Sequence, residues 1–265
     1  MPVLVTSAHQ SLARRIAGSL LDDGAQVRLH TPGDVSSLRA AGAYVATGTP
    51  DDEGHLEAAL TNVHTAVHVG RGLDADPALI VRDAQVLANA ATGAAVERII
   101  MLSLPGAAAN ADDPLRRAKA AAEAALATVP CPLIVLRVGL VATAWLRDTV
   151  ATAGLPTEVL DTEVAPVGLA DVAELVAGFD RARAASTDGQ LIVAADGPQR
   201  LPLSRYLDAA GVATAGSGSL VGRQVADAAV ASRLVSMLRG PWDAADEPGV
   251  LDGWQFSGVI PSAAT

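Results

Sequence analysis

Short apolar runs alternate, in the first part of the chain, with stretches in which apolar residues recur every three or four positions. The first run covers residues 3–5, and Leu12, Ile16 and Leu20 then define one face of a helix. A second strand pattern follows at residues 26–30. Strand, turn, helix and strand in this order predict the βαβ unit that opens a dinucleotide-binding sheet.

The alternation continues as far as residue 137. It predicts helices at 34–41, 53–60, 77–91 and 114–128, and further strands at 42–47, 65–69, 98–103 and 132–137. Parallel neighbours need crossover connections, and helices between successive strands supply them. We therefore predict an α/β fold of the Rossmann type, a doubly wound parallel sheet with strand order 3-2-1-4-5-6.

Beyond residue 140 the pattern loosens. Helix patterns appear at 145–153, 172–184, 203–210 and 223–238, and an apolar run at 190–194 predicts an extra strand at the sheet edge. We divide the chain into a Rossmann-like core, residues 1–140, and a C-terminal region, residues 141–265. This region is expected to complete the sheet and form a small substrate lobe within one structural domain. Trp145, Trp242 and Trp254 either line an apolar pocket or anchor packing.

Composition narrows the class of partner. The net charge of −10 argues against nucleic acid and against an anionic membrane surface. No apolar run reaches the ~18 residues of a membrane span. The single cysteine, Cys131, cannot form an internal disulfide, so we expect a cytoplasmic protein. The histidines and acidic residues lack metal-ligand spacing, so we predict no metal. A small-molecule substrate or ligand remains as partner, and a homo-oligomer stays open.

The basic residues are unevenly divided between the two types. Of 19 lysines and arginines, only Lys119 is a lysine. A coding bias toward arginine explains the excess, and the surviving lysine then favours a position that needs a compact, tunable amine. A lysine left by chance is the alternative interpretation.

Six motifs in order carry a resemblance to a known family. They are residues 3–13 (V-L-V-T-S-A-H-Q-S-L-A against V-T-G-A-T-G-x-x-G), the fourth strand at 63–69, the fifth at 98–103, Lys119 with Glu123, L-R-V-G at 136–139 and V-G-L-A-D-V-A at 167–173. Over roughly its first 185 residues the chain thus resembles the short-chain dehydrogenase/reductase superfamily, closest to its atypical and extended, NmrA-like and epimerase-like branches. The resemblance implies a Rossmann fold, NAD or NADP as cofactor and a small-molecule substrate.

The first turn departs from the family motif at its glycines. Ser7, Gln10 and Ala13 occupy the three glycine positions, of which the second lets the backbone approach the pyrophosphate. The side chain of Gln10 is expected to project where the phosphates would lie, whereas Ser7 is tolerable with ordinary dihedral angles. This argues against ordinary NAD(P) binding. The helix start still offers free N–H groups to an anion.

The residues that would touch a cofactor follow from the same alignment. They are Ser7, His9, Gln10, Ser11 and Leu12 in the turn, together with Thr31 at the end of the second strand. The acidic residue or arginine that normally distinguishes NAD from NADP is absent from positions 30–33. Asp34 and Asp171 are expected to cap the helices that follow them.

The catalytic set is also incomplete. The family places a tyrosine four residues before its lysine, and Leu115 stands there in this chain. We predict Lys119 as a general acid or base with a lowered pKa, together with Ser103 and His9 around the substrate. For Ser103 the alternative is a strand-end hydroxyl bonded to backbone, and for His9 an exposed loop residue. His68 is expected to be structural.

Three functions remain open. The first is a small-molecule enzyme with an impaired dinucleotide site, which catalyses isomerisation, dehydration or cyclisation by acid/base chemistry. The second is an NAD(P)-dependent oxidoreductase or epimerase with atypical phosphate contacts. The third is a non-catalytic ligand sensor or structural subunit, in which a partner covers the surface freed by the lost cofactor.

Overall fold

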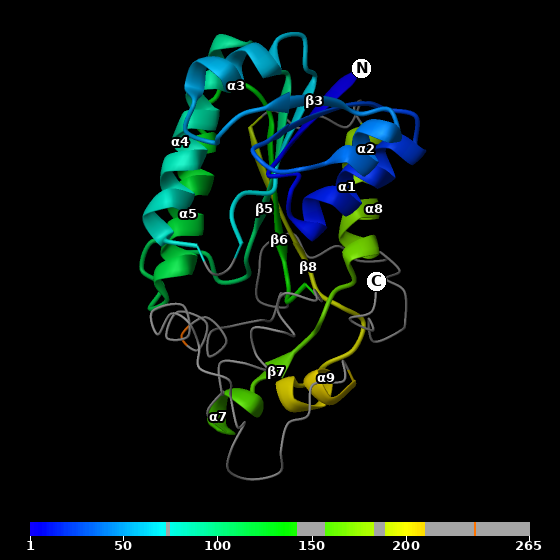
Figure 1. Ribbon diagram of the computed structural model, residues 1–265. Helices are drawn as coiled ribbons and strands as arrows, with labels where there is room; N and C mark the ends of the chain where they lie inside the picture. Colours follow the sequence, from blue (N-terminus) through cyan, green and yellow to red (C-terminus); the bar gives the residue numbers. More distant parts are fainter. Residues whose placement is uncertain (73–74, 142–156, 183–188, 210–235, 237–265) are drawn as a thin grey trace.

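The computed structural model describes residues 1–72, 75–141, 157–182, 189–209 and 236 (Figure 1). At its centre lies a seven-stranded sheet, entirely parallel, in the order β3-β2-β1-β4-β5-β6-β8. Its strands are β1 (Pro2–Thr6), β2 (Gln26–Thr31), β3 (Tyr44–Thr47), β4 (Thr65–His68), β5 (Arg98–Ser103), β6 (Leu133–Val138) and β8 (Gln190–Ala195). The predicted strand order and the extra edge strand are confirmed.

The chain adds β2 and β3 on one side of β1 and then returns to add β4 on the other side. Val3 on β1 pairs with Val27 on β2 at one side and with Thr65 on β4 at the other. The connections that leave β1 and β4 therefore diverge at the carboxyl ends of these two strands. In open α/β sheets ligands bind in the crevice formed at such a point.

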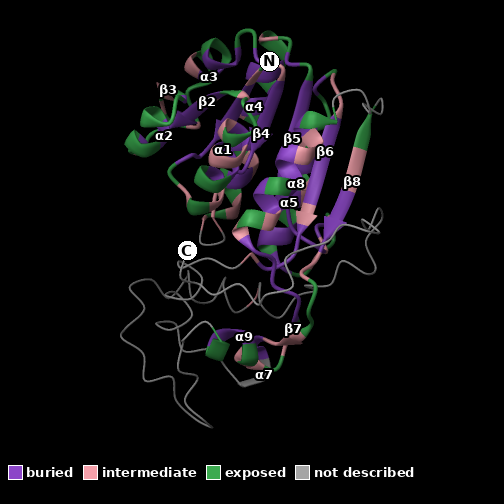
Figure 2. Cartoon of the chain, turned by 90° about the vertical axis from the view of Figure 1, so that its right-hand side faces the viewer, coloured by how far each residue is buried: buried purple, intermediate pink, exposed green. Residues whose placement is uncertain are grey.

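Helices cover both faces of the sheet and close two hydrophobic cores. One face carries α3 (Glu53–Leu60), α4 (Pro77–Gly93) and α5 (Pro114–Leu126), and the other carries α1 (Ser11–Asp22), α2 (Ser36–Ala40) and α8 (Leu169–Arg181). Side chains of a strand point alternately to opposite faces. Leu4 accordingly lies in the core with α3–α5, whereas Val3 and Val5 lie in the core with α1 and α8. Figure 2 shows the central strands as almost wholly buried.

Aspartates start three of the helices, as capping residues do. Asp52, Asp76 and Asp113 each accept a hydrogen bond from a backbone N–H in the first turn of α3, α4 and α5. The prediction for Asp171 is wrong, because α8 begins at Leu169 and Asp171 lies inside its first turn. A carboxylate is favourable there too, since it faces the positive end of the helix dipole. The prediction for Asp34 is wrong as well, because the N-cap residue of α2 is Val35. Asp34 lies one residue earlier and accepts a hydrogen bond from Ser36 N.

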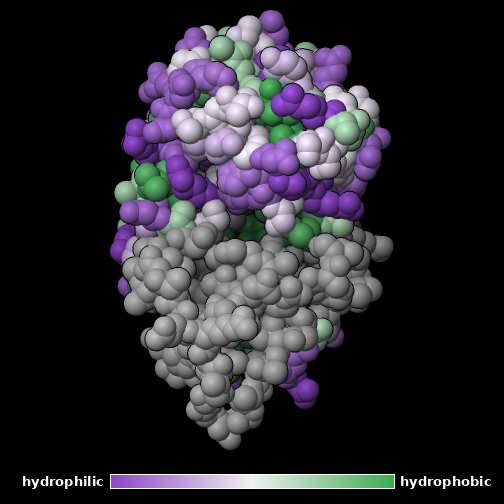
Figure 3. Space-filling view, in the orientation of Figure 1, coloured by the Kyte–Doolittle hydropathy of each residue, from purple (hydrophilic) through white to green (hydrophobic). Residues whose placement is uncertain are grey.

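A small group of elements lies beyond the carboxyl edge of the sheet (Figure 1). It comprises α7 (Thr157–Leu160), α9 (Leu203–Ala209) and the antiparallel strands β7 (Glu163–Val164) and β9 (Leu201–Pro202). The helices predicted at 145–153 and 223–238, and the three tryptophans, lie outside the described residues. None of the helices in the described part is long and apolar enough to cross a bilayer. On the face seen in Figure 3, that part presents mostly hydrophilic residues with small, separate apolar groups.

Candidate functional site

In the turn between β1 and α1, Ser7 adopts a backbone conformation that usually requires glycine. Ser7 has a φ of 57°, in the left-handed region. It therefore does not have the ordinary dihedral angles with which a serine would be tolerable at this glycine position. Ser7 N donates to His30 O at 3.0 Å, and Gln10 N donates to Ser7 O at 2.9 Å. A left-handed residue other than glycine costs about 1–2 kcal/mol, so these contacts hold the turn in a strained shape.

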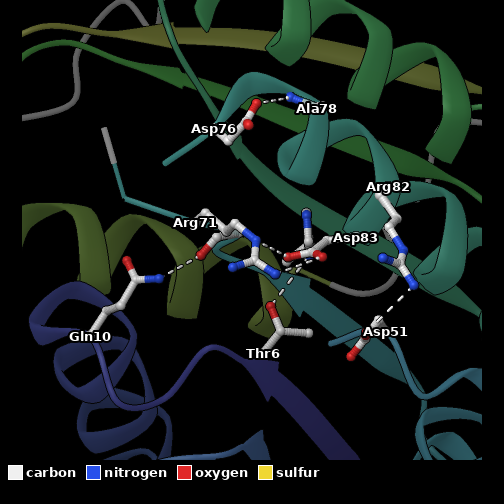
Figure 4. A network of polar contacts seen from close by, with 10 residues as sticks. Thr6, Gln10, Asp51, Arg71, Asp76, Ala78, Arg82 and Asp83 are labelled. Atoms are coloured by element: carbon white, nitrogen blue, oxygen red, sulfur yellow. Dashed lines mark hydrogen bonds and ion pairs between the residues drawn. The ribbon is translucent and has the colours of Figure 1, made fainter. Parts of the chain in front are cut away.

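Gln10 bridges the crevice between β1 and β4. It occupies the N-cap position of α1, but its side chain makes no capping hydrogen bond. Instead, Gln10 Nε2 donates to the carbonyl oxygen of Gly70, just after β4, at 2.7 Å (Figure 4). The Gln10 side chain thus extends from the turn after β1 to the residue that follows β4.

The first turn of α1 offers three backbone donors. Within the described residues, the N–H groups of Ser11, Leu12 and Ala13 make no hydrogen bond. The same turn contains no acidic residue. Such a helix start attracts anions, because the N–H groups and the helix dipole both favour negative charge.

His9 and Thr31 form a separate contact at the end of β2. His9 Nδ1 lies 3.1 Å from Thr31 Oγ1, and the His9 side chain packs directly over Gly33, which has no room for a Cβ. Partial burial, and then the charges of Arg14 and Arg71, lower the pKa of His9. Among the described residues no contact joins His9 to Ser103 or Lys119, so the structure does not gather the predicted catalytic trio.

Ser103 belongs to a buried polar network at the end of β5. Its hydroxyl donates to Glu123 Oε1 at 2.5 Å, and not to the backbone. The same carboxylate binds Arg137 on β6, with Arg137 Nη2 at 2.7 Å from Glu123 Oε2. This network fixes α5 against β5 and β6, and Lys119 lies one helical turn before Glu123 on α5.

Lys119 is buried beside this network. Its side chain is 4% exposed, and Nζ donates to Leu102 O at 3.1 Å. Burial lowers the pKa of Lys119 to about 8, and the charge of Glu123 only partly opposes this shift. Leu115, at the position of the missing tyrosine, is buried. An amine with this pKa can give up or take a proton near neutral pH.

His68, which is expected from the sequence to be structural, lies beside Lys119. It lies at the end of β4, and its Nδ1 is 3.3 Å from Thr6 Oγ1. A Cβ built on Gly70 would lie 3.4 Å from His68 Nε2 and 3.5 Å from Lys119 Nζ, so both nitrogens face Gly70. Burial, and then the charge of Lys119, lower the pKa of His68 to about 3. The sequence places His68 at the end of a strand that pairs with β5, and this position is what brings it close to Lys119.

Residues 70–72 are here called the crevice strap, and Gly70 at its start lies against these two nitrogens. Gln10 holds the strap by Gly70 O. Arg71 holds it from the other side, with Nη2 at 3.1 Å from Asp83 Oδ1 and Nε at 2.7 Å from Oδ2 (Figure 4). Burial raises the pKa of Asp83, and Arg71 opposes this shift. The strap is thus fastened to both α1 and α4.

Cys131 is a free cysteine outside this network. Burial raises the pKa of the Cys131 thiol to about 11, which disfavours the reactive thiolate. Within the described residues, no group of three histidine, cysteine or acidic side chains is arranged to hold a metal ion.

Comparison with known proteins shows the fold. No protein-family model and no curated protein sequence matches the chain. A nucleoside-diphosphate-sugar epimerase from Staphylococcus aureus superposes with a TM-score of 0.69 at 15% identity, over 90% of this chain and 88% of that one. The triphenylmethane reductase of Citrobacter sp., complexed with NADP(H), gives 0.64 at 19% identity, over 85% and 79%.

A third likeness is of the same kind. UDP-glucose 4-epimerase from Thermotoga maritima, with UDP-glucose bound, gives a TM-score of 0.63 at 16% identity, over 87% of this chain and 88% of that one. At these identities the likenesses establish an α/β Rossmann-type fold, in agreement with the expectation from the motifs. They do not identify the reaction, because one fold can carry many different activities.

Proposed function

We propose that this chain is an enzyme, related to the reductases and epimerases of the short-chain dehydrogenase/reductase type, that moves a proton on a small molecule. Lys119 is its general acid or base. The reaction class is isomerisation, dehydration or cyclisation, none of which needs a net transfer of hydride. The observation that carries the proposal is the burial of the chain's one lysine at the carboxyl edge of the sheet.

The burial of Lys119 is costly. A pKa lowered from 10.5 to about 8 corresponds to about 3 kcal/mol of lost stability at neutral pH, at ~1.4 kcal/mol per pKa unit. A leucine or methionine of similar volume would avoid this cost. Groups with strongly perturbed pKa values are concentrated at functional sites, and such a site supplies a reason for retaining the amine.

The neighbours of Lys119 have distinct roles in this proposal. Ser103 and Glu123 are positioning residues, because their hydrogen bond fixes the helix that carries Lys119. His68 remains neutral at the working pH and faces the same point as Lys119. A neutral imidazole beside an ammonium group can share the stabilisation of a developing oxyanion.

The first turn fits a dinucleotide poorly. In its usual pose the pyrophosphate approaches the backbone at the position of Gln10, and here the Gln10 amide extends across that space to Gly70. No step of the proposed reaction uses NAD or NADP. His9, Thr31 and the N–H groups of α1 are assigned to binding an anionic part of the ligand.

Exchange of hydrogen with solvent tests the proposal in a mixture of candidate substrates. The protein is incubated in D2O with a metabolite extract, and mass spectrometry records which compounds gain deuterium. We expect at least one compound to gain deuterium with the wild type and not with Lys119→Met. Equal labelling by the two proteins, or none by either, would overturn the proposal.

A second candidate is an NAD(P)-dependent oxidoreductase or epimerase. The free N–H groups of Ser11, Leu12 and Ala13 favour it, as does the likeness in fold to a reductase solved with NADP(H). Fluorescence titration with NADH and NADPH distinguishes the two candidates. Tight binding of either nucleotide by the wild type would favour this candidate over the first.

A further inference from the structure

Gln10 joins the turn after β1 to the segment after β4, at the point where the crevice opens, and the proposed acid/base chemistry does not use this contact. Its Nε2 to Gly70 O distance of 2.7 Å is that of a well-formed hydrogen bond. The contact links residues 60 positions apart in the sequence. Its partner atom belongs to the crevice strap, so whatever releases Gln10 also releases one fastening of the strap.

The strap is what hides the proposed acid/base pair. Gly70 is buried and lies against both Lys119 Nζ and His68 Nε2, which are on side chains that are each only 4% exposed. Its φ of +75° is a conformation that favours glycine. A side chain at this position would be strained, and its Cβ would be in van der Waals contact with the two nitrogens.

The charges around the strap show how firmly it is held. Arg71 is paired with Asp83, whose carboxyl group is buried. Asp51 lies nearby and pairs with Arg82 at 3.5 Å (Figure 4). Gln10 is neutral, so its contact with Gly70 O carries less energy than the ion pair and is the weaker of the two fastenings.

We propose that Gln10 is the residue that excludes a dinucleotide from this crevice, through its hydrogen bond to Gly70, and that the same bond keeps the strap closed over Lys119. This inference deepens the proposed function, on which its second half rests. The crevice then admits a ligand that is smaller than a dinucleotide and displaces the Gln10 amide from Gly70. Specificity is set by one side chain that crosses the pyrophosphate position, whereas the rest of the turn retains the backbone donors.

Binding of NADH and NADPH to the full chain tests the first half. The variant is Gln10→Gly, which restores the bare backbone at that position. Its matched control is Ser37→Gly, which adds the same backbone freedom on α2, outside the crevice, and removes an exposed side chain. We expect Gln10→Gly to bind at least one of the nucleotides at least about tenfold more tightly than the wild type, and Ser37→Gly to match the wild type.

Further variants separate the competing explanations. Gln10→Ala replaces Gln10→Gly if the glycine variant loses its cooperative unfolding transition. His9→Ala tests whether the end of β2 is the real obstacle. A gain with His9→Ala and none with Gln10→Gly would overturn the inference, as would a folded Gln10 variant that gains nothing. Tight nucleotide binding by the wild type, unchanged by Gln10→Gly, would overturn it as well.

Hydrogen exchange tests the second half. We expect the backbone amides of residues 70–72 to exchange faster in Gln10→Ala than in the wild type, and those of β5 to be unchanged. The nucleotide titration of Gln10→Gly does not involve the acid/base role of Lys119, which the labelling experiment in D2O tests separately. A failed acid/base role for Lys119 is thus distinguishable from a failed role for Gln10. Unchanged exchange at the strap would overturn its proposed closure by Gln10.

Discussion

The hydroxyl of Ser103 donates a 2.5 Å hydrogen bond to the carboxylate of Glu123. This contact joins the end of β5 to α5 across the base of the candidate site, and Arg137 binds the same carboxylate from β6. All three side chains are buried or nearly so. The network therefore lies in a medium where a missing partner is expensive.

Removal of the carboxylate should be strongly destabilising. Glu123→Ala deletes the buried partner of both Ser103 and Arg137, and we expect it to lower the free energy of unfolding by about 3 kcal/mol. Ser103→Ala should cost about 1–2 kcal/mol. Urea unfolding measures both, with Ser37→Ala on the exposed side of α2 as the control. Losses no greater than that of Ser37→Ala would contradict the described network.

Lys119→Met should stabilise the protein. The folded-state pKa of Lys119, about 8, lies below its ordinary value of 10.5, so the unfolded chain binds more protons between these values. Stability of the wild type should therefore rise with pH from about 8 to 10.5, and below that window the full cost remains. At pH 7 we expect Lys119→Met to gain about 2–3 kcal/mol, with the gain shrinking as the pH rises through the window.

Denaturant unfolding at pH 7 and at pH 10 measures this difference. Lys119→Arg is the matched variant, because arginine keeps its charge throughout the range and should be less stable than the wild type at both pH values. A Lys119→Met variant that is less stable than the wild type at pH 7 would show that the amine carries no such cost.

Two buried histidines should make the fold sensitive to acid. Burial lowers the pKa of His30 to about 4 and that of His68 to about 3, below the ordinary value of 6.5. Their stabilising contribution is complete above pH 6.5 and is lost as the pH falls through the window down to these values. Each histidine should contribute a slope approaching ~1.4 kcal/mol per pH unit within its window.

Removal of one of these groups should reduce that slope. The free energy of unfolding of His30→Gln and of His68→Gln is measured between pH 7.5 and the acid limit of the folded state. In each variant the slope of the free energy of unfolding against pH should fall by an amount that corresponds to about one proton. Ser37→Ala should have the same slope as the wild type. An unchanged slope in both variants would mean that the two imidazoles are protonated in the folded state.

Ser7→Gly should relieve strain in the first turn. Ser7 has a φ of 57°, and glycine adopts this conformation without steric penalty. After the greater entropy loss of glycine is subtracted, we expect a net gain of about 0.5–1 kcal/mol. Ser11→Gly, at the start of α1, should instead lose stability. Thermal unfolding compares the two, and a destabilised Ser7→Gly would show that the serine side chain holds the turn.

The sheet could be predicted because its strands are buried on both faces and therefore appear as unbroken apolar runs. The run around Leu133 to Leu136 is one example. The start of α8 was misplaced, because Asp171 has the composition of a cap but lies in the first turn. Local composition does not distinguish these two positions, since an acidic residue is favourable at both.

The site could be predicted only where a residue breaks a local pattern. Gln10 stood out because it occupies a glycine position, and Lys119 because it is alone of its type. The contact of Gln10 with Gly70, and the convergence of His68 and Lys119, depend on the packing of elements that are distant in sequence. Ser103 illustrates the same limit, because its partner Glu123 is a side chain on another element.

The place of β8 in the sheet has a consequence for how the protein is made. This strand, Gln190–Ala195, covers the outer edge of β6 along its whole length. Until the ribosome has released this segment, β6 presents an unpaired and almost wholly apolar edge, of the kind that recruits other chains. Nascent chains that stall before β8 has been synthesised are therefore prone to aggregation. The sheet is complete only when β8 has paired with β6.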